Sequence, residues 1–290
     1  LVVFLLVLQF KEQILKTKPF LLMGILNITR DSFYDGGKFF TLEKAIERAF
    51  QIKEEGADLL DIGAESTRPF SEGMPLNEEK ERIEKVLFAL KDSGYDIPIS
   101  IDTQKAEVAK IAVELGAEMI NDVSAGRNEP ELLDIVAKSK KFLVLMHMRG
   151  TPKDMQVNPR YDDVVCEVKN EILFFIENAR KKGIEKEKII IDPGIGFGKK
   201  AEDNIKLISN LDKFAQLNYK VLIGVSRKSV IGNITGAMVE ERLPGTISLN
   251  VCALLKGATI FRVHDVKENK QALSCAFEVF KSQQLENSIN

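Results

Sequence analysis

Polar side chains recur at the ends of short apolar runs in this 290-residue chain. Asp102, Asn121 and Asp192 each follow such a run, and Asp192 is followed by Pro193 and three alternating glycines. The carboxyl ends of strands in a parallel α/β sheet meet at one edge, where ligands bind. Carboxylate and amide groups at that edge predict a site for a ring that carries several N–H donors.

Cationic side chains follow the last two apolar runs of the chain. Arg227 and Lys228 follow one run, and Arg262 and His264 lie at the end of the other. The corresponding loops of barrel enzymes frequently hold a phosphate group. We therefore expect a pocket with a carboxylate and amide wall that faces a cationic wall, suited to a heterocycle with a phosphate group at its far end.

The chain shows no signature of a covalent nucleophile. It has no GxSxG segment, no Cys close to a His, and no Ser and Lys placed as in acylating enzymes. The expected chemistry is electrostatic, with cations and Mg²⁺ stabilising a departing anionic group and a carboxylate stabilising positive charge on the organic fragment. Mg²⁺ would be held mainly by phosphate oxygens, with Asn27 as a candidate protein ligand.

Simpler interpretations compete for some of these residues. Asp122, Asp203 and Asp265 are expected to cap helices. His147 lies between two Met residues at the end of an apolar run, which favours a structural role over ligand contact. The glycines after Asp192 could serve only to permit a tight turn.

Apolar runs alternate with longer amphipathic runs from residue 20 onward, which predicts βα units. The predicted strands span 21–27, 58–63, 97–102, 118–123, 142–147, 188–192, 220–225 and 258–263. The predicted helices span 41–55, 77–92, 105–115, 129–139, 162–182, 203–216, 242–256 and 266–281. Eight such units predict an α/β fold, a (β/α)8 TIM barrel, over residues 19–290. The alternative is an open doubly wound sheet.

Two connections after predicted strands, 28–40 and 64–76, are about twice the usual length, and a third, 148–160, is also long. Such loops are candidates for binding loops. Residues 1–18 are expected to form an N-terminal extension or a strand at the end of the barrel. Their apolar run is too short for a membrane span.

The composition is that of a globular protein: 44% hydrophobic, 29% charged, with a net charge of −2. It offers no basic excess for nucleic acid or for a membrane surface. The three Cys residues are far apart and form no metal motif, so we expect small core residues in a reducing, cytoplasmic compartment.

Nine segments together resemble dihydropteroate synthase. They are Met23-Gly-Ile-Leu-Asn27-Ile-Thr, Asp31-Ser-Phe-Tyr-Asp-Gly-Gly37, Glu65-Ser-Thr-Arg-Pro69, Ser100-Ile-Asp-Thr103, Ile120-Asn-Asp-Val-Ser124, Met146-His-Met-Arg-Gly150, Asp192-Pro-Gly-Ile-Gly-Phe-Gly198, Ser226-Arg-Lys-Ser229 and Arg262-Val-His264. The resemblance covers about residues 20 to 280. It implies a (β/α)8 barrel that joins p-aminobenzoate to 6-hydroxymethyl-7,8-dihydropterin diphosphate and releases pyrophosphate through a carbocation-like species.

The resemblance also implies residue roles. Asp102, Lys228 and Arg262 would be the catalytic residues. The pterin would be held by Asp102, Asn121, Asp192 and Lys228, with Met146 and Phe197 as apolar lining. The diphosphate and Mg²⁺ would meet Asn27, Arg68, Arg262 and His264. The p-aminobenzoate would meet Thr67, Pro69, Phe197, Lys228 and Ser229. The family is commonly homodimeric through its outer helices.

Three residues depart from the family pattern: Arg30 replaces a usual Pro, and Ala64 and Phe70 replace common Gly residues. They put loop closure and the response to sulfonamides in doubt, but not the pterin contacts. Two other functions remain open. One is a pterin-binding methyltransferase acting on methyltetrahydrofolate, which would not need the cationic end of the pocket. The other is a pterin-binding paralogue without turnover.

Overall fold

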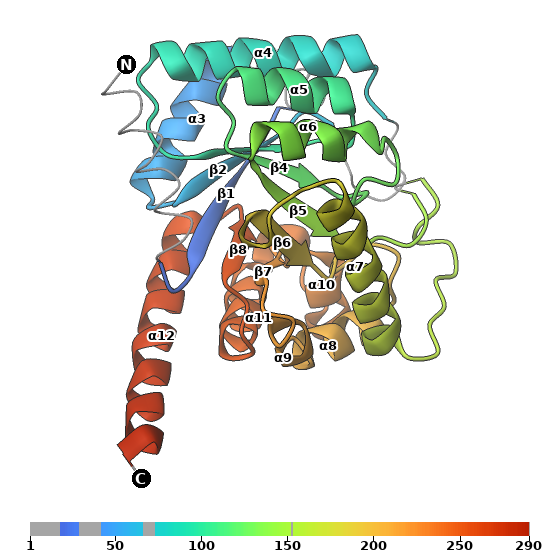
Figure 1. Ribbon diagram of the computed structural model, residues 1–290. Helices are drawn as coiled ribbons and strands as arrows, with labels where there is room; N and C mark the ends of the chain where they lie inside the picture. The colour runs from blue at the N-terminus through green and yellow to red at the C-terminus, as the bar shows by residue number, and fades with distance from the viewer. Residues whose placement is uncertain (1–17, 29–41, 66–72, 152, 290) are drawn as a thin grey trace.

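The computed structural model describes residues 18–28, 42–65, 73–151 and 153–289, and side chains as far as residue 282. Eight parallel strands close into a barrel, with β8 paired to β1 (Figure 1). The strands are β1 (Leu21–Asn27), β2 (Leu59–Gly63), β3 (Ile99–Asp102), β4 (Met119–Asp122), β5 (Phe142–Met146), β6 (Ile189–Asp192), β7 (Lys220–Ile223) and β8 (Ile260–Val263). The predicted barrel is therefore confirmed, and the open sheet is excluded.

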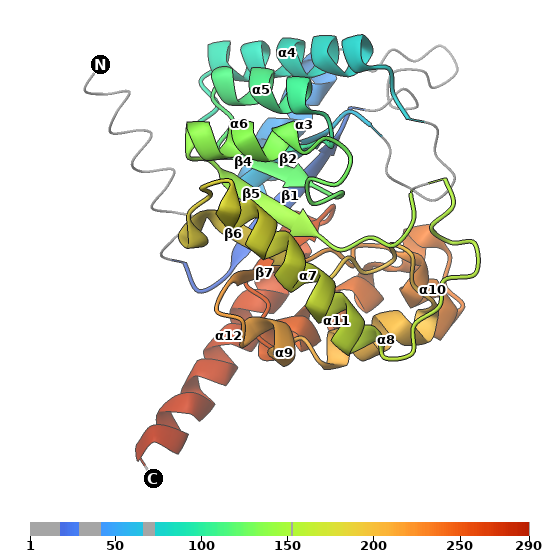
Figure 2. The ribbon, with the colours of Figure 1, turned by 45° about the vertical axis from the view of Figure 1, so that its right-hand side comes forward.

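Helices cover the outside of the barrel. They are α3 (Leu42–Glu54), α4 (Leu76–Asp92), α5 (Ala106–Glu114), α6 (Glu131–Ser139), α7 (Val164–Lys181), α8 (Ala201–Ser209), α9 (Asp212–Ala215), α10 (Ser229–Thr235), α11 (Leu243–Leu255) and α12 (Val266–Ile289), with short 3₁₀ turns η1 (Lys186–Lys188) and η2 (Val239–Glu241). In Figure 2, α7 passes over the barrel beside β5 and β6. Figure 1 shows α12 running on past the barrel to the C-terminus.

Two helix predictions need correction. The helix predicted over 203–216 is two helices, α8 and α9, because the chain turns at Asn210, whose backbone φ is −117°. Helix α10 was not predicted, because its seven residues are too few for an amphipathic period to show.

The core has two layers because strand side chains alternate between the two faces of the sheet. Inward-facing residues fill the barrel below its mouth, and among them are Met23, Met119 and Phe142. Outward-facing residues pack under the helices in a larger cluster. The filled lower barrel leaves the carboxyl ends of the strands as the place where polar side chains can gather.

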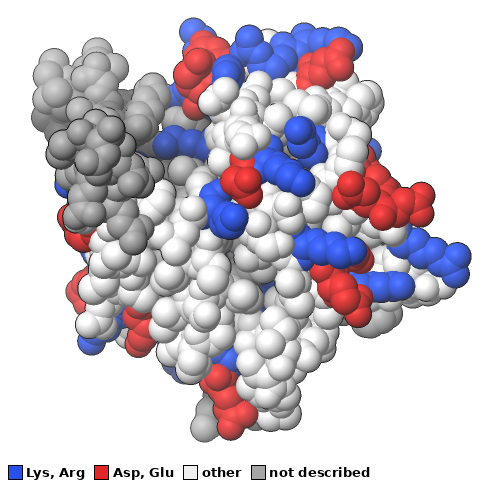
Figure 3. Space-filling view, turned by 90° about the horizontal axis from the view of Figure 1, so that it is seen from below, with Lys and Arg blue, Asp and Glu red and all other residues white. Residues whose placement is uncertain are grey.

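Three features concern the surface. Cys166, Cys252 and Cys275 are free and exposed, so the expectation that they are core residues is wrong. No helix in the described part of the chain is long and apolar enough to cross a membrane. On the face seen in Figure 3, Lys and Arg side chains lie among Asp and Glu side chains rather than forming a field of one sign.

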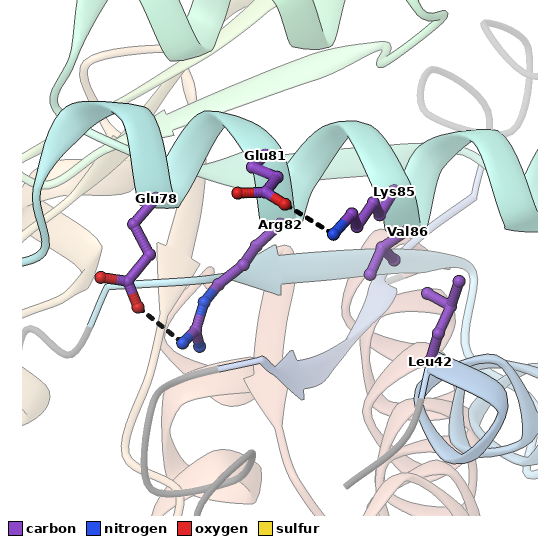
Figure 4. A pocket seen from close by; sticks show the side chains of 6 residues that line it. All are labelled: Leu42, Glu78, Glu81, Arg82, Lys85 and Val86. Carbon is purple, nitrogen blue, oxygen red and sulfur yellow. Dashed lines mark hydrogen bonds and ion pairs between the residues drawn. The ribbon is translucent and has the colours of Figure 1, made fainter.

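A hollow on the outer surface lies between the start of α3 and α4 (Figure 4). Two ion pairs within α4 line it, Arg82 with Glu78 and Lys85 with Glu81. Arg82 also donates a hydrogen bond to the carbonyl of Ile28, at 2.9 Å, and so ties α4 to the end of β1.

Candidate active site

The strand register brings the predicted acidic and amide residues to one rim. Gly63 of β2 is paired with Asp102, and Asp102 is paired with Asn121. On the other side of the barrel, Met146 is paired with Asp192. Gly63, Asp102, Met146 and Asp192 each end a strand, and Asn121 is one residue before the end of β4, so all five lie at the carboxyl ends of the strands.

Arg262 of β8 joins two acidic residues at this rim. Its Nε donates to Asp61 Oδ2 at 2.6 Å, and its Nη2 donates to Asp102 Oδ2 at 2.9 Å. Asn121 Nδ2 donates to the same oxygen of Asp61 at 3.3 Å. The expectation of two opposed charged walls is therefore wrong in this respect, because the guanidinium group lies between the carboxylates and pairs with both.

Two carboxylate oxygens at the mouth have no hydrogen-bond partner. In the described part of the chain, four buried side-chain polar atoms are unpaired, and three of them are Asp61 Oδ1, Asp102 Oδ1 and Ser100 Oγ. Asp61 and Ser100 are paired residues of β2 and β3, so the three atoms belong to one corner of the barrel. An unpaired buried acceptor costs about 1–3 kcal/mol. A ligand that carries N–H donors would remove that cost.

The charged groups at this corner have shifted pKa values. Burial raises the pKa of Asp102 to about 7, although Arg262 acts in the opposite direction. Burial also acts to lower the pKa of Arg262, but Asp61 and Asp102 offset this and hold it above its usual value. Shifts of this kind cluster at functional sites.

Asp192 and Lys228 form the opposite side of the opening. Asp192 Oδ1 accepts from the backbone N–H of Gly194 at 2.7 Å, and burial raises the pKa of this carboxyl group. Lys228 Nζ donates to the carbonyl of Ile195 at 2.5 Å and lies 4.6 Å from the centre of the Phe197 ring. Burial lowers the pKa of Lys228 to about 8, while Asp192 acts to raise it.

An apolar cluster adjoins these charges. It contains Met146 and Phe197, which were predicted, together with Val123, Met148 and Met155, which were not. Met148 and Met155 come from the long connection after β5, and sequence alone does not show which side chains of a loop fold back. The polarizable Met side chains suit the face of a flat ring.

The residues that follow β7 and β8 have different hydrogen-bond partners. His264 Nδ1 lies 2.9 Å from Ser226 Oγ at the ends of β8 and β7. Ser229 is exposed and begins α10. Arg227 forms two hydrogen bonds with Asp265, at 2.8 and 2.9 Å. Asp265 lies just before α12, but its carboxylate pairs with Arg227.

Asn27 ends β1 and is exposed. A methyl group added at Gly63 would lie 4.0 Å from Asn27 Oδ1 and 3.8 Å from Asp102 Oδ2, so glycine leaves a gap between these two side chains. The described residues contain no group of three or more His, Cys, Asp or Glu that could hold a metal ion. Thr67, Arg68 and Pro69, like the departures Arg30 and Phe70, lie outside the described residues.

His147 is a structural residue, as the sequence favoured. It is fully buried, and its ring nitrogens lie 2.9 Å from Lys199 Nζ and 3.1 Å from Glu171 Oε2. Asp122 holds the turn after β4 by accepting from the backbone N–H groups of Ser124 and Gly126. It does not cap α6, which begins at Glu131.

No ligand contact was predicted from the sequence for Asp61 or Ser100. The signal for both was a polar residue inside an apolar strand, two positions before the strand's last residue. Residues two positions apart in a strand lie on the same face of the sheet. Asp61 and Ser100 therefore lie on the same face as the last residue of their strand, and that face points into the barrel.

Known proteins resemble this chain along most of its length. A family model described as pterin binding enzyme matches residues 23–264. Dihydropteroate synthase of Synechocystis is 45% identical over 255 residues, which cover 88% of each chain. The Escherichia coli enzyme of the same name is 41% identical and covers 87% of this chain and 88% of its own.

Solved structures agree. Dihydropteroate synthase of Xanthomonas albilineans with 4-aminobenzoic acid has a TM-score of 0.83 at 44% identity, covering 89% of this chain and 92% of its own. A sulfonamide complex of the Yersinia pestis enzyme has a TM-score of 0.85 at 39% identity, covering 90% and 94%. The chain therefore belongs to the pterin-binding enzyme family and, within it, to the dihydropteroate synthases.

Proposed function

We propose that this protein joins p-aminobenzoate to 6-hydroxymethyl-7,8-dihydropterin diphosphate, giving 7,8-dihydropteroate and pyrophosphate. One observation carries the proposal. The unpaired buried oxygens of Asp61 and Asp102 lie at one opening with Asn121 and Asp192. A pterin ring presents several N–H donors along its edge, and these acceptors match them. A structure of the Xanthomonas albilineans enzyme in complex with 7,8-dihydropteroate, at 42% identity, supports the same conclusion.

The pterin would lie between acceptors and an apolar surface. Asp102, Asn121 and Asp192 would accept or donate along its edge, while Met146 and Phe197 would cover a face of the ring. Lys228 would donate to a ring acceptor from beside Phe197. The unpaired oxygen of Asp61 would accept a hydrogen bond from the ring, and its other oxygen would hold Arg262 in place.

The diphosphate would meet Arg262, His264 and Asn27, together with Arg68. Arg262 has a guanidinium fork suited to phosphate oxygens. A bound Mg²⁺ would neutralise charge on the leaving diphosphate, with the Asn27 carboxamide oxygen as protein ligand and phosphate oxygens as the others. A single carboxamide fits this cation only if phosphate supplies most of the oxygens.

In the reaction, the bond between the pterin methylene carbon and the diphosphate oxygen breaks first, and its electron pair leaves with pyrophosphate. The ionised carboxylate of Asp102 would stabilise the positive charge that develops on the pterin. The amine of p-aminobenzoate then donates its lone pair to the methylene carbon, and the proton that it loses passes to the released pyrophosphate. Thr67, Pro69, Phe197, Lys228 and Ser229 would receive the p-aminobenzoate.

The two other functions are less well supported. A methyltransferase acting on methyltetrahydrofolate would not need Arg262 and His264 at the mouth, and the relatives reported above are dihydropteroate synthases. A paralogue without turnover would be expected to have lost a charged contact. Asp102, Asp192, Lys228 and Arg262 instead all lie at one opening.

The decisive assay measures pyrophosphate released from the pterin diphosphate with Mg²⁺, in the presence and absence of p-aminobenzoate. Release should depend on p-aminobenzoate and be matched by 7,8-dihydropteroate in equal amount by mass spectrometry. Tight binding of the pterin diphosphate without product would favour the paralogue. Methyl transfer from methyltetrahydrofolate, without pyrophosphate release, would favour the methyltransferase.

We further propose that the protein is a cytoplasmic homodimer. Leu255 of α11 and Val279 of α12 are exposed apolar residues on outer helices and offer a surface for a second copy. Light scattering during size-exclusion chromatography gives the mass of the assembly directly. A mass of one chain at micromolar concentration would contradict the dimer.

A further inference from the structure

The loop that follows β6 is held by side chains along its whole backbone. Five successive carbonyls, those of residues 194–198, each accept a hydrogen bond from a side chain. The donors are Lys199 to Gly194 and Phe197, Lys228 to Ile195, Gln156 to Gly196, and Tyr161 to Gly198. Loop carbonyls usually face water, so this coverage indicates a segment whose position matters.

Lys199 makes more of these contacts than any other side chain in the described residues. Its Nζ lies 2.9 Å from the carbonyl oxygens of both Gly194 and Phe197, and 2.9 Å from His147 Nδ1. A longer contact of 3.3 Å reaches the carbonyl of His147. The side chain is only 2% exposed. Burial lowers the pKa of Lys199 to about 7, although Asp192 acts to raise it, so the group is partly protonated near pH 7. These four oxygen and nitrogen acceptors compensate the burial of its N–H donors.

The loop lies directly on the backbone that leaves β5. A methyl group at Gly194 would come within 1.9 Å of the carbonyl oxygen of His147, and one at Gly198 within 2.2 Å of that of Arg149. Lys199 Nζ occupies the space beside this contact, 3.4 Å from the same position at Gly194. The ammonium group therefore joins the turn after β6 to the end of β5.

His147 accepts the hydrogen bond from Lys199. Burial, followed by the charge of Lys199, lowers the pKa of His147 to about 4, so the ring is neutral near pH 7. Because Nδ1 faces the ammonium group, the ring proton lies on Nε2 and is donated to Glu171. Glu171 is held in turn by Arg149. The contacts through His147, Glu171 and Arg149 therefore hold Lys199 on the side that faces away from the loop.

The loop holds two groups that would face the pterin in the proposed site. Asp192 Oδ1 is anchored by the N–H of Gly194, and the ring of Phe197 lies beside Lys228. Lys199 binds the carbonyls of Gly194 and Phe197, which are the backbone units next to these groups. A shift of the loop would move the carboxylate and the ring together.

We propose that Lys199 is a positioning residue of the pterin site, which fixes the 192–198 loop so that Asp192 and Phe197 meet the ring in the correct geometry. This role rests on the proposed function. Lys199 does not touch the pterin and acts through the backbone that it holds. A displacement of about 1 Å in such a group is enough to weaken binding strongly.

The test compares Lys199→Met with Lys200→Met. The two lysines are neighbours, but Lys200 is exposed and forms no part of the loop contacts. Calorimetry with 6-hydroxymethylpterin, which carries no diphosphate, should show at least a tenfold loss of affinity for Lys199→Met. The affinity of Lys200→Met should stay within twofold of the unaltered protein. In steady state, the KM for the pterin diphosphate should rise by a larger factor than kcat falls.

Folding is controlled by circular dichroism and by the melting temperature. If Lys199→Met does not fold, Lys199→Gln serves, because its amide keeps two N–H donors and loses the charge. Folded protein of either variant that binds the pterin as tightly as Lys200→Met would overturn the role, even if its melting temperature were lower. Pterin binding without turnover in the unaltered protein would overturn only the proposed function. Normal turnover with equal affinities in both Met variants would overturn only the role of Lys199.

Discussion

At the scale of single residues, Arg262 has two roles in the proposed site. It forms ion pairs with Asp61 and Asp102, and we propose that it also meets the diphosphate at the mouth of the barrel. Its side chain is 22% exposed, whereas that of Asp61 is fully buried. This exposure would let the side chain receive a phosphate while it keeps its ion pairs.

We predict that Arg262→Ala weakens binding of the pterin diphosphate far more than binding of the uncharged pterin. It should also cost roughly 3–5 kcal/mol of stability, because Asp61 and Asp102 would lose their shared cation. Arg262→Lys is the matched control, since it keeps the charge but not the fork. Calorimetry with both ligands and urea unfolding give the two quantities. Equal losses for the two ligands would contradict the division of the pocket.

Asp102 and Lys228 predict a bell-shaped pH profile. Asp102, with a pKa of about 7, must ionise, and Lys228, with a pKa of about 8, must stay protonated. Thus kcat/KM for the pterin diphosphate should rise as pH passes about 7 and fall above about 8. Arg262 acts on both groups, Asp61, Glu79 and Asp122 also act on Asp102, and Asp102 and Asp192 also act on Lys228, so the two limbs report coupled titrations. Lys228→Arg should have a lower kcat/KM that no longer falls above about pH 8. If the fall is unchanged, a group other than Lys228 causes it.

Sequence could predict Asp102, Asn121 and Asp192 because each ends a recognisable apolar run. It could not predict that Arg262 pairs with Asp61, because 201 residues separate the two. That contact depends on the closure of β8 onto β1, which sets the distance across the mouth. For the same kind of reason, the sequence could not predict that Arg227 pairs with Asp265, which becomes its partner only when β7 and β8 lie side by side.

At the scale of elements, the loop after β6 requires glycine for two separate reasons. Gly194 has a φ of +68°, which favours glycine, and any side chain there would collide with the carbonyl of His147. Gly183, after α7, has a φ of +94° but has no atom within 4 Å of the position of an added methyl group. A side chain at Gly183 would therefore cause backbone strain alone, whereas one at Gly194 would cause both backbone strain and a steric collision.

We predict that Gly194→Ala destabilises the protein by several kcal/mol and abolishes pterin binding, whereas Gly183→Ala costs about 1 kcal/mol. The difference arises because a contact of 1.9 Å forces the loop away from β5. Urea unfolding and pterin titration measure the two effects. Similar unfolding free energies for both variants would show that the loop can move without loss.

The order and type of most elements could be predicted, because eight apolar runs alternate with amphipathic ones. The strand at 21–27 was predicted with its correct ends. The division between α8 and α9 was missed because the apolar pattern continues through Leu207, Ile208 and Leu211, all of which are buried in the core. The pattern reports burial, and a turn that keeps the same residues buried does not interrupt it.

At the scale of the whole molecule, two groups of buried charges lie on the carboxyl side of the sheet. Asp61, Asp102 and Arg262 form one group, and His147, Lys199 and Glu171 form a second under the loop after β6. The first has unpaired oxygens that suit a ligand. In the second group, both ring nitrogens of His147 have hydrogen-bond partners, so this group stabilises the fold. Because protonation of the ring would disrupt these contacts, the protein should be sensitive to acid.

His147 predicts that stability falls in mild acid. Its pKa is about 4 in the folded protein, against 6.5 for a histidine exposed to water in the unfolded chain, so between these values the unfolded chain binds more protons. The free energy of unfolding should therefore decrease as pH falls from about 6.5 to about 4, by roughly 3 kcal/mol. The bond from His147 lowers the pKa of Glu171, which adds a loss in the same direction below about pH 4.5.

The chain has two His residues, which provides a matched comparison. His147→Asn keeps an acceptor for Lys199 but removes the titrating ring, so its unfolding free energy should change less between pH 6.5 and 4. His264→Asn leaves the buried group intact and should keep the slope of the unaltered protein. Urea unfolding at several pH values measures all three slopes. A slope in His147→Asn as steep as in His264→Asn would show that other groups cause the acid sensitivity, because the linkage relation assigns the slope to the group that gains protons on unfolding.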